Sequence, residues 1–171
     1  MNNLFSNDKD IIYLFDAIDE NVSHQIIKEI IIKSQISNNI FLFINSPGGS
    51  VIDALAIYDI IQYYKDKITT VGLGVVGSIA TLLLSSASFK KRYLFNNTTI
   101  HIHLPFGVTE IEESKSNEVI MEELRLVELA TGLFTKHTNS KLNLDRLGKQ
   151  ENLIFNAYDA VNNYGLADHI I

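Results

Sequence analysis

Ser78 is the residue of this chain best suited to nucleophilic chemistry. It stands in the small-residue segment from Gly74 to Ala80, inside the longest stretch without a charged side chain, and the pattern predicts a tight turn between a strand and a helix. A hydroxyl presented on such a turn can attack a carbonyl carbon once a neighbouring base removes its proton. Taken alone, the same serine would be interpreted as a helix N-cap, because serine is among the residues preferred there.

A histidine suited to act as this base follows along the chain. His101 and His103 alternate on a predicted strand, so both side chains point to the same face. His103 ends the strand just before Pro105, where its imidazole can reach the edge of the sheet. A lone histidine there is more often structural, but imidazole is the group that a serine nucleophile requires.

A glycine turn provides candidate donors for an oxyanion. Pro47, Gly48 and Gly49 follow a predicted strand and precede a helix that Ser50 can cap. Glycine permits positive φ and a close approach of the backbone to a ligand. The N–H groups at the start of a helix can stabilise a developing negative charge. By itself, such a turn is more typical of an ordinary strand-to-helix connection.

Alternating strands and helices must position these residues. Apolar runs predict strands at 11–15, 40–44, 68–73, 93–95, 98–104 and 166–171, and helical spacing predicts helices at 21–32, after Ser50, and at 78–86, 110–138, 142–148 and 156–164. The helix after Ser50 is expected to bury Ile52, Leu55, Ala56 and Ile60. The continuous apolar run 40–44 is typical of a strand buried on both faces of a parallel sheet. Repeated strand–helix–strand units predict an α/β fold, and we expect one domain over residues 1–171.

The long helix at 110–138 carries more apolar positions than one small core can cover. Among its many glutamates lie Val119, Ile120, Leu124, Val127, Leu129 and Leu133. A partner subunit is the cover that we expect, so the chain is predicted to form an oligomer.

Composition argues against several classes of protein. The formal net charge is −6, and Lys90-Lys91-Arg92, interpreted as an exposed turn, is the only basic run, so no nucleic-acid partner is expected. The absence of cysteine excludes disulfides and thiolate zinc sites. Residues 68–89 are long enough to cross a membrane, but interrupting glycines and hydroxyl residues favour a strand, a turn and a buried helix instead. No membrane, metal or cofactor is expected.

Several ordered motifs together resemble the proteolytic subunit of Clp protease, the ClpP family. They are the segment Phe43–Val51 with Ile57-Tyr58-Asp59 after it, Gly74-x-x-Gly77-Ser78, Ile102-His103-x-Pro105, and the C-terminal stretch from Ala157 to Asp168. The resemblance implies a ClpP/crotonase-like α/β fold with a long protruding handle at about 106–138. It also implies a homo- or hetero-oligomer of two stacked heptameric rings around a chamber. Unfolded polypeptides or peptides would be hydrolysed there without a cofactor, delivered by a AAA+ unfoldase.

The resemblance implies a role for each candidate residue. Ser78 would be the nucleophile and His103 the general base, and the backbone N–H groups of Gly49 and Ile79 would form the oxyanion hole. The family's aspartate position, counted without gaps from His103, falls on Asn152. An amide can hydrogen-bond an imidazole but cannot stabilise an imidazolium by charge, and in a Ser-His-Asp triad this change lowers kcat about 10⁴-fold.

We therefore expect a serine endopeptidase subunit whose activity is weak or depends on assembly. The alternative is a catalytically silent structural or regulatory ring subunit that partners an active paralogue. A third hypothesis, an acyl-CoA hydratase of the same fold, lacks support because Ser78 and His103 suit hydrolysis and no paired glutamates replace them.

Other departures from the family pattern concern partners and location. Ala80, Val108 and Ile111 replace glycines usual in the family, which alters the surroundings of the nucleophile and the edge along which peptides would dock. Few residues precede the first predicted strand, so coupling to an unfoldase is in doubt. The polar, acidic N-terminus lacks the apolar core of an export signal, and we expect a cytoplasmic protein or one of a plastid or other organelle stroma.

Overall fold

The computed structural model describes residues 10–103, 117–138 and 152–171. The elements run in the order β1 (Ile11–Leu14), α1 (Glu20–Ser34), β2 (Ile40–Ser46), α2 (Val51–Tyr63), β3 (Ile68–Gly77), α3 (Ile79–Ser85), β4 (Arg92–Leu94), β5 (Thr99–Ile102), α4 (Asn117–His137), β6 (Leu153–Asn156), α5 (Ala157–Asn162) and β7 (His169–Ile170). The predicted helix at 142–148, the positions Val108 and Ile111, and the first part of the predicted handle lie outside the described residues.

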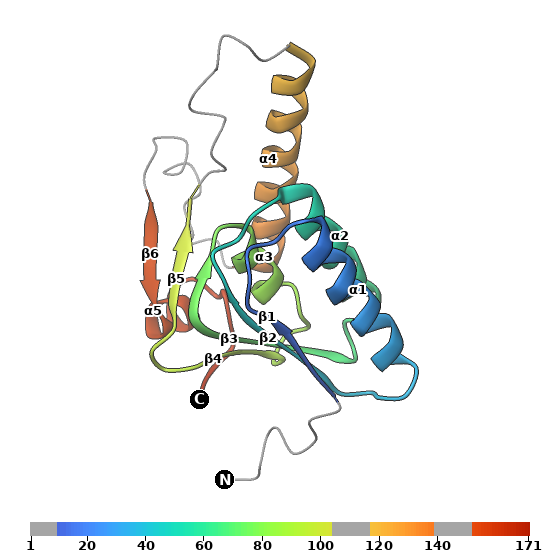
Figure 1. Ribbon diagram of the computed structural model, residues 1–171. Coiled ribbons are helices and arrows are strands. Elements are labelled where there is room, and N and C mark those ends of the chain that lie inside the picture. The colour runs from blue at the N-terminus through green and yellow to red at the C-terminus, as the bar shows by residue number, and fades with distance from the viewer. Residues whose placement is uncertain (1–9, 104–116, 139–151) are drawn as a thin grey trace.

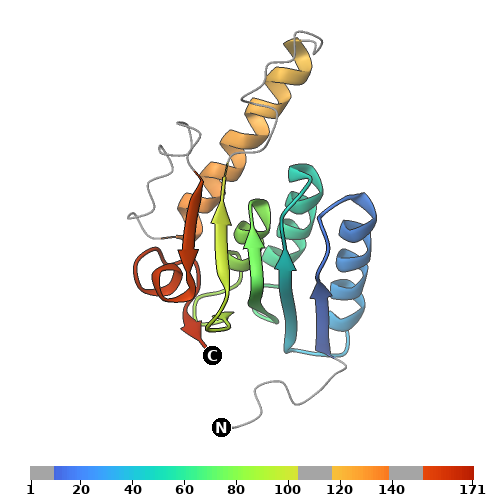
Figure 2. The ribbon, with the colours of Figure 1, turned by 60° about the vertical axis from the view of Figure 1, so that its left-hand side comes forward.

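The described strands form one mixed, mostly parallel sheet, which confirms the predicted α/β fold. The order is β1-β2-β3-β4-β7, while β5 pairs with the second half of β3 and β6 pairs with β5. Only the β5–β6 ladder is antiparallel among the described pairs. Figure 2 shows β5 lying between β3 and β6. The carboxyl ends of β3 and β5 therefore meet at one edge of the sheet.

Helices α1, α2 and α3 cover one face of the sheet (Figures 1 and 2). The starts of α1 and α2 are set by side chains that accept main-chain N–H bonds: Asp19 from Val22 N at 2.8 Å, and Ser50 from Asp53 N at 3.4 Å. Alternation along β2 sends Ile40, Leu42 and Ile44 into the main core and turns Phe41 and Phe43 to the other face. All five side chains are buried, as predicted for this strand.

The predicted buried side of α2 is wrong in part. Ile52 is 58% exposed, and Ala56 is exposed as well. The residues buried instead are Ala54, Ile57, Tyr58 and Ile61. Because α2 packs between α1 and α3 and most of its positions are apolar, its neighbours rather than its own pattern decide which side turns inward.

Residues 68–89 form β3, α3 and the loop after it, as the sequence predicted in preference to a membrane span. Of the helices that the structure describes, none is long and apolar enough to cross a membrane.

Helix α4 lies within the range predicted for the long helix. Its C-terminal half packs on the body through the buried side chains of Ala130 and Phe134, whereas its N-terminal half extends beyond the sheet (Figure 1). On that half Val119, Met121 and Leu124 are exposed. The function of α4 as a handle between rings stays a prediction.

Arg92 corrects the interpretation of Lys90-Lys91-Arg92 as an exposed turn. Lys90 is exposed, but Arg92 lies in β4 and is buried. Its Nε donates to Asp168 Oδ2 at 2.9 Å, and its Nη1 donates to the carbonyl oxygens of His137 at 2.8 Å and Gly165 at 3.1 Å. The guanidinium thus joins the sheet, the end of α4 and the C-terminal segment.

Candidate active site

Ser78 lies between β3 and α3 in a conformation that non-glycine residues rarely adopt. Its φ is 52° and its ψ is −131°, and its side chain makes no capping hydrogen bond to α3. An ordinary N-cap residue has extended backbone angles and accepts such a bond, so the N-cap interpretation does not describe this serine. A positive φ costs on the order of 1–3 kcal/mol, and residues held in this way cluster at functional sites.

The surroundings impose this conformation. The Ser78 N–H donates to the carbonyl oxygen of His101 in β5 at 2.6 Å. A Cβ on Gly48 would lie only 2.6 Å from Ser78 Cβ, and one on Gly77 only 2.8 Å from Pro47 O. The glycine turn after β2 is therefore packed directly against the serine turn after β3. Two segments that are separate in the sequence can lie this close because Gly48 and Gly77 have no side chains at the contact.

Gly49 and Ile79 bring backbone N–H groups to this contact. Ile18 forms a parallel bridge with Gly49, in which Ile18 N donates to Gly48 O and Ser50 N donates to Ile18 O, each at 2.8 Å. Those bonds do not use the N–H of Gly49. Ile79 is the first residue of α3, so its N–H has no acceptor within the helix. The nitrogen of Ile79 lies close to the glycine turn, since a Cβ on Gly48 would be 3.3 Å from it. Both groups can donate to a ligand oxygen.

The β5–β6 ladder ends one residue short of His103 and Asn152. Its register pairs His101 with Ile154 and Ile102 with Leu153. The same register continued by one residue would bring His103 opposite Asn152. Directly opposite residues of an antiparallel pair have Cβ atoms about 4.5–5.5 Å apart. His103 is half-buried and Asn152 exposed. Since Gly77 pairs with His101 on the other side of β5, the Ser78 turn also lies beside this end of the strand.

The sequence did not predict β6, the strand that begins directly after Asn152. Residues Leu153-Ile154-Phe155 contain the β-branched and aromatic types favoured in strands, and this short run was the available signal. The predicted last helix begins one residue earlier than α5, and the predicted last strand is reduced to the two residues of β7.

The arrangement has the parts that serine hydrolases use: a hydroxyl on a strained turn, an imidazole at the adjoining strand end, and backbone N–H groups beside the hydroxyl. The chain belongs to the Clp protease family, since a family model described as Clp protease matches residues 2–171.

Two curated bacterial proteins similar to this chain are both named ATP-dependent Clp protease proteolytic subunit. The one from Carsonella ruddii (strain PV) is 33% identical over 133 residues, covering 77% of this chain and 69% of the relative. The one from Dehalococcoides mccartyi (strain ATCC BAA-2266 / KCTC 15142 / 195) is 31% identical over 163 residues, covering 94% of this chain and 81% of the relative.

Proposed function

We propose that Ser78 and His103 carry out peptide-bond hydrolysis in this Clp-family chain. The family and the names of both relatives support a serine endopeptidase that acts as a subunit of a Clp protease. The observation that carries the assignment of residues is the backbone of Ser78, held at positive φ between the glycine turn and β5. A serine needed only as a helix cap would have no reason to be held there.

In this mechanism Ser78 Oγ attacks the carbonyl carbon of the scissile peptide while His103 accepts the hydroxyl proton. The N–H groups of Gly49 and Ile79 donate to the oxygen as negative charge develops on it, which is commonly the largest single contribution in acyl transfer. His103 then gives the proton to the leaving amine, and an acyl group remains on Ser78. Water activated by His103 hydrolyses this ester and restores the serine.

Asn152 is the residue that limits this mechanism. The register of the β5–β6 ladder, continued by one residue beyond Ile102 and Leu153, supports a hydrogen bond between this amide and the imidazole of His103. A neutral amide does not stabilise the imidazolium that forms when Ser78 loses its proton. We therefore propose a weak peptidase, or one whose activity depends on assembly. The same observation favours the second candidate function, a nearly silent ring subunit beside an active paralogue.

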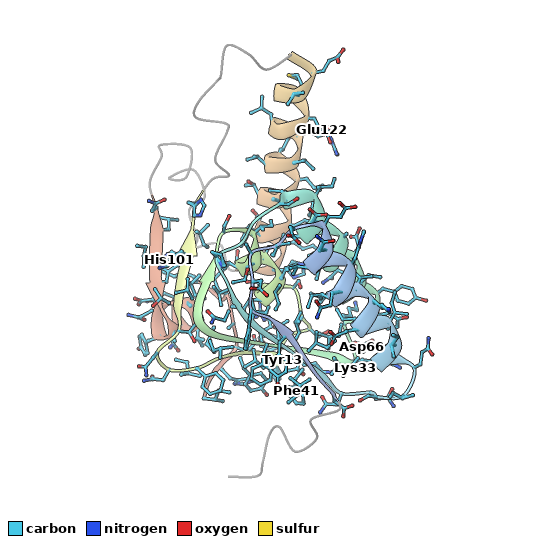
Figure 3. The ribbon with its side chains drawn as sticks, in the orientation of Figure 1. Tyr13, Lys33, Phe41, Asp66, His101 and Glu122 are labelled. Atoms are coloured by element: carbon cyan, nitrogen blue, oxygen red, sulfur yellow. The ribbon has the colours of Figure 1, made fainter. Side chains whose placement is uncertain are left out.

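Membership of the family implies an oligomeric protease that works with ATP-dependent Clp unfoldases. Two apolar surfaces support the proposal of partners for this chain. One is the exposed apolar part of α4, and the other is the sheet face opposite the helices, where Tyr13 is exposed beside Phe15 and Phe43 (Figure 3). Apolar area of this kind marks interaction sites. Stacked heptameric rings, the particular unfoldase and a cytoplasmic location remain proposals.

A fluorophosphonate probe tests the assignment of Ser78. We expect covalent labelling of the assembled protein at Ser78, and none in the Ser78→Ala variant. A short fluorogenic peptide should be cleaved slowly by the parent protein and not by the variant. Absence of labelling in the assembled protein, both alone and mixed with an active paralogue, would show that the subunit is structural.

A further inference from the structure

Thr81 is a hydroxyl residue in the first turn of α3, close after Ser78 in the chain. Its side chain is fully buried, and its Oγ1 donates to the carbonyl oxygen of Val76 in β3 at 3.1 Å. A threonine inside a helix ordinarily donates to a carbonyl oxygen three or four residues earlier. Thr131 and Thr135 of α4 follow this pattern, each with an acceptor four residues before it. The Thr81 hydroxyl instead reaches back past the start of its helix, across the turn of the nucleophile, to β3.

The hydrogen bonds of Thr81 and His101 fix successive peptide groups around Ser78. The Thr81 hydroxyl binds the carbonyl oxygen of Val76, and the Thr81 N–H donates to the carbonyl oxygen of Ser78 at 3.0 Å. Between these two bonds, the Ser78 N–H donates to the carbonyl oxygen of His101 at 2.6 Å. A peptide group is planar, so a bond to the Ser78 carbonyl also restricts the direction of the Ile79 N–H in the same plane. Thr81 therefore acts on the nucleophile and on one of the proposed oxyanion donors.

Val76 lies where the pairing of β3 with β2 becomes irregular. The one residue between Ile44 and Ser46 in β2 lies opposite the three residues 73–75 in β3. Such a bulge disrupts the ladder locally and bends its strand. The first half of β3 therefore does not dictate, through its pairing with β2, how the backbone enters the turn of the nucleophile. The bond from Thr81 acts at this point, and it ties the end of β3 to the helix that follows (Figure 1).

We propose that Thr81 is a positioning residue for the nucleophile, and that its hydroxyl keeps Ser78 in the strained conformation. This inference rests on the proposed role of Ser78 in peptide hydrolysis. A residue at positive φ keeps that conformation only while its surroundings hold it, so the loss of one bond lets the turn shift. A displacement of about 1 Å can lower a rate by about 100-fold. Because Thr81 is fully buried and cannot touch a substrate, its loss should act on kcat and not on KM.

The test compares variants that differ in the hydroxyl alone. Thr81→Val keeps the shape of the side chain without the hydroxyl, and we expect kcat for a fluorogenic peptide to fall about 10–100-fold with KM unchanged. The rate of fluorophosphonate labelling at Ser78 should fall by a similar factor. Thr81→Ser keeps the hydroxyl and should stay close to the parent, whereas Thr81→Ala, which differs from it only in the hydroxyl, should be as slow as Thr81→Val.

Thr70→Val is the matched control. Thr70 is another fully buried residue of β3, and its Oγ1 donates to the carbonyl oxygen of Leu84 at 2.7 Å, near the opposite end of α3 from Ser78. Its loss should lower the free energy of unfolding in urea about as much as Thr81→Val does, but leave the turnover of each folded subunit unchanged. If both variants lose stability and neither loses turnover, Thr81 has only a structural role and the proposal is wrong.

The outcomes separate this inference from the function on which it rests. A parent protein that cleaves peptide and is labelled no faster than Thr81→Val contradicts the positioning role alone. A parent that neither cleaves peptide nor reacts with fluorophosphonate contradicts the proposed function, and the positioning role falls with it. If Thr81→Val does not fold, the comparison of Thr81→Ser with Thr81→Ala decides between the two roles of the hydroxyl.

Discussion

Ser78 depends on the absence of side chains around it. Gly48, with φ 97°, and Gly77 both lie where a Cβ would collide with the opposite turn. The positive φ of Ser78 is therefore maintained by close backbone packing rather than by a preference of serine itself. At this scale the candidate site is a set of backbone positions, and the hydroxyl is the group that they present.

Gly48→Ala should abolish peptide cleavage and lower the free energy of unfolding by about 1–3 kcal/mol. The added Cβ meets Ser78 Cβ at 2.6 Å and requires alanine at φ 97°. Gly132→Ala in α4 is the matched control. A Cβ at this position would have no atom within 4 Å, and the substitution replaces a glycine inside a helix. Urea denaturation should show this control more stable by about 0.5–1 kcal/mol. A fully active Gly48→Ala protein would contradict the close packing.

Asn152→Asp should raise the kcat of peptide cleavage by about 10²–10⁴-fold. A carboxylate opposite His103 would hold the ring in the correct tautomer and stabilise the imidazolium. The measurement is the kcat for a fluorogenic peptide, with Asn152→Ala as the control that removes both the charge and the hydrogen bond. If the aspartate variant remains as inactive as the alanine variant, the silent ring subunit becomes the better description.

Among the elements, α4 is fixed to the body at its last turn. Arg92 donates to the carbonyl oxygen of His137, and the Tyr58 hydroxyl is 2.8 Å from His137 Nε2. Burial, together with the positive charges of Lys136 and Arg92, lowers the pKa of His137 to about 4. The side chain of folded His137 is therefore neutral near pH 7, and its hydrogen bond to Tyr58 needs no charge.

Arg92→Leu should destabilise the fold by about 3–5 kcal/mol, because it leaves the Asp168 carboxylate buried without its partner. The double variant Arg92→Leu/Asp168→Leu should recover part of this loss, since neither charge then remains buried. Urea denaturation of the parent, both single variants and the double variant gives the coupling free energy. Additive effects of the two single changes would contradict a functional ion pair.

The stability of the fold should fall as the pH drops from about 6.5 toward 4. The folded pKa of His137 lies below the value of about 6.5 expected in the unfolded chain, so its contribution is complete above pH 6.5 and is lost on acidification. Comparison with His137→Gln isolates this contribution from that of other groups. The difference in the free energy of unfolding between the two proteins should depend on pH in this window, and a constant difference would contradict the assigned pKa.

At the scale of the whole molecule, one subunit leaves apolar surface uncovered. The first half of the described α4 exposes Met121 and Leu124 and carries the Glu122–Arg125 ion pair on its surface, with Glu122 labelled in Figure 3. Contiguous apolar exposure on a helix that extends from the body is expected where another subunit packs. The single chain therefore buries its own hydrophobic core, whereas the apolar side chains on this half of α4 stay exposed to solvent unless a partner subunit covers them.

Leu124→Glu combined with Met121→Glu should reduce the mass of the assembled particle without lowering the thermal stability of the subunit's core. Both side chains are exposed in the single chain, so the added carboxylates should disturb only a contact with a partner subunit that covers these positions. Lys28→Glu, on the exposed side of α1, is the matched control and should leave the mass unchanged. Light scattering after size-exclusion chromatography makes the comparison, and an unchanged mass of the double variant would place the subunit contacts elsewhere.

The sequence by itself determined the order of the main elements, the turn that carries Ser78 and the strand that leads to His103. These features follow from local patterns: apolar runs, alternation and glycine at turns. Only the tertiary structure decided that β6 pairs with β5, that Arg92 is buried, and which side of α2 turns inward. Each of these depends on pairing or packing with residues distant in the chain, and a local period contains no information about such partners. The residue types of the candidate site could thus be predicted from the sequence, whereas their arrangement in space required the fold.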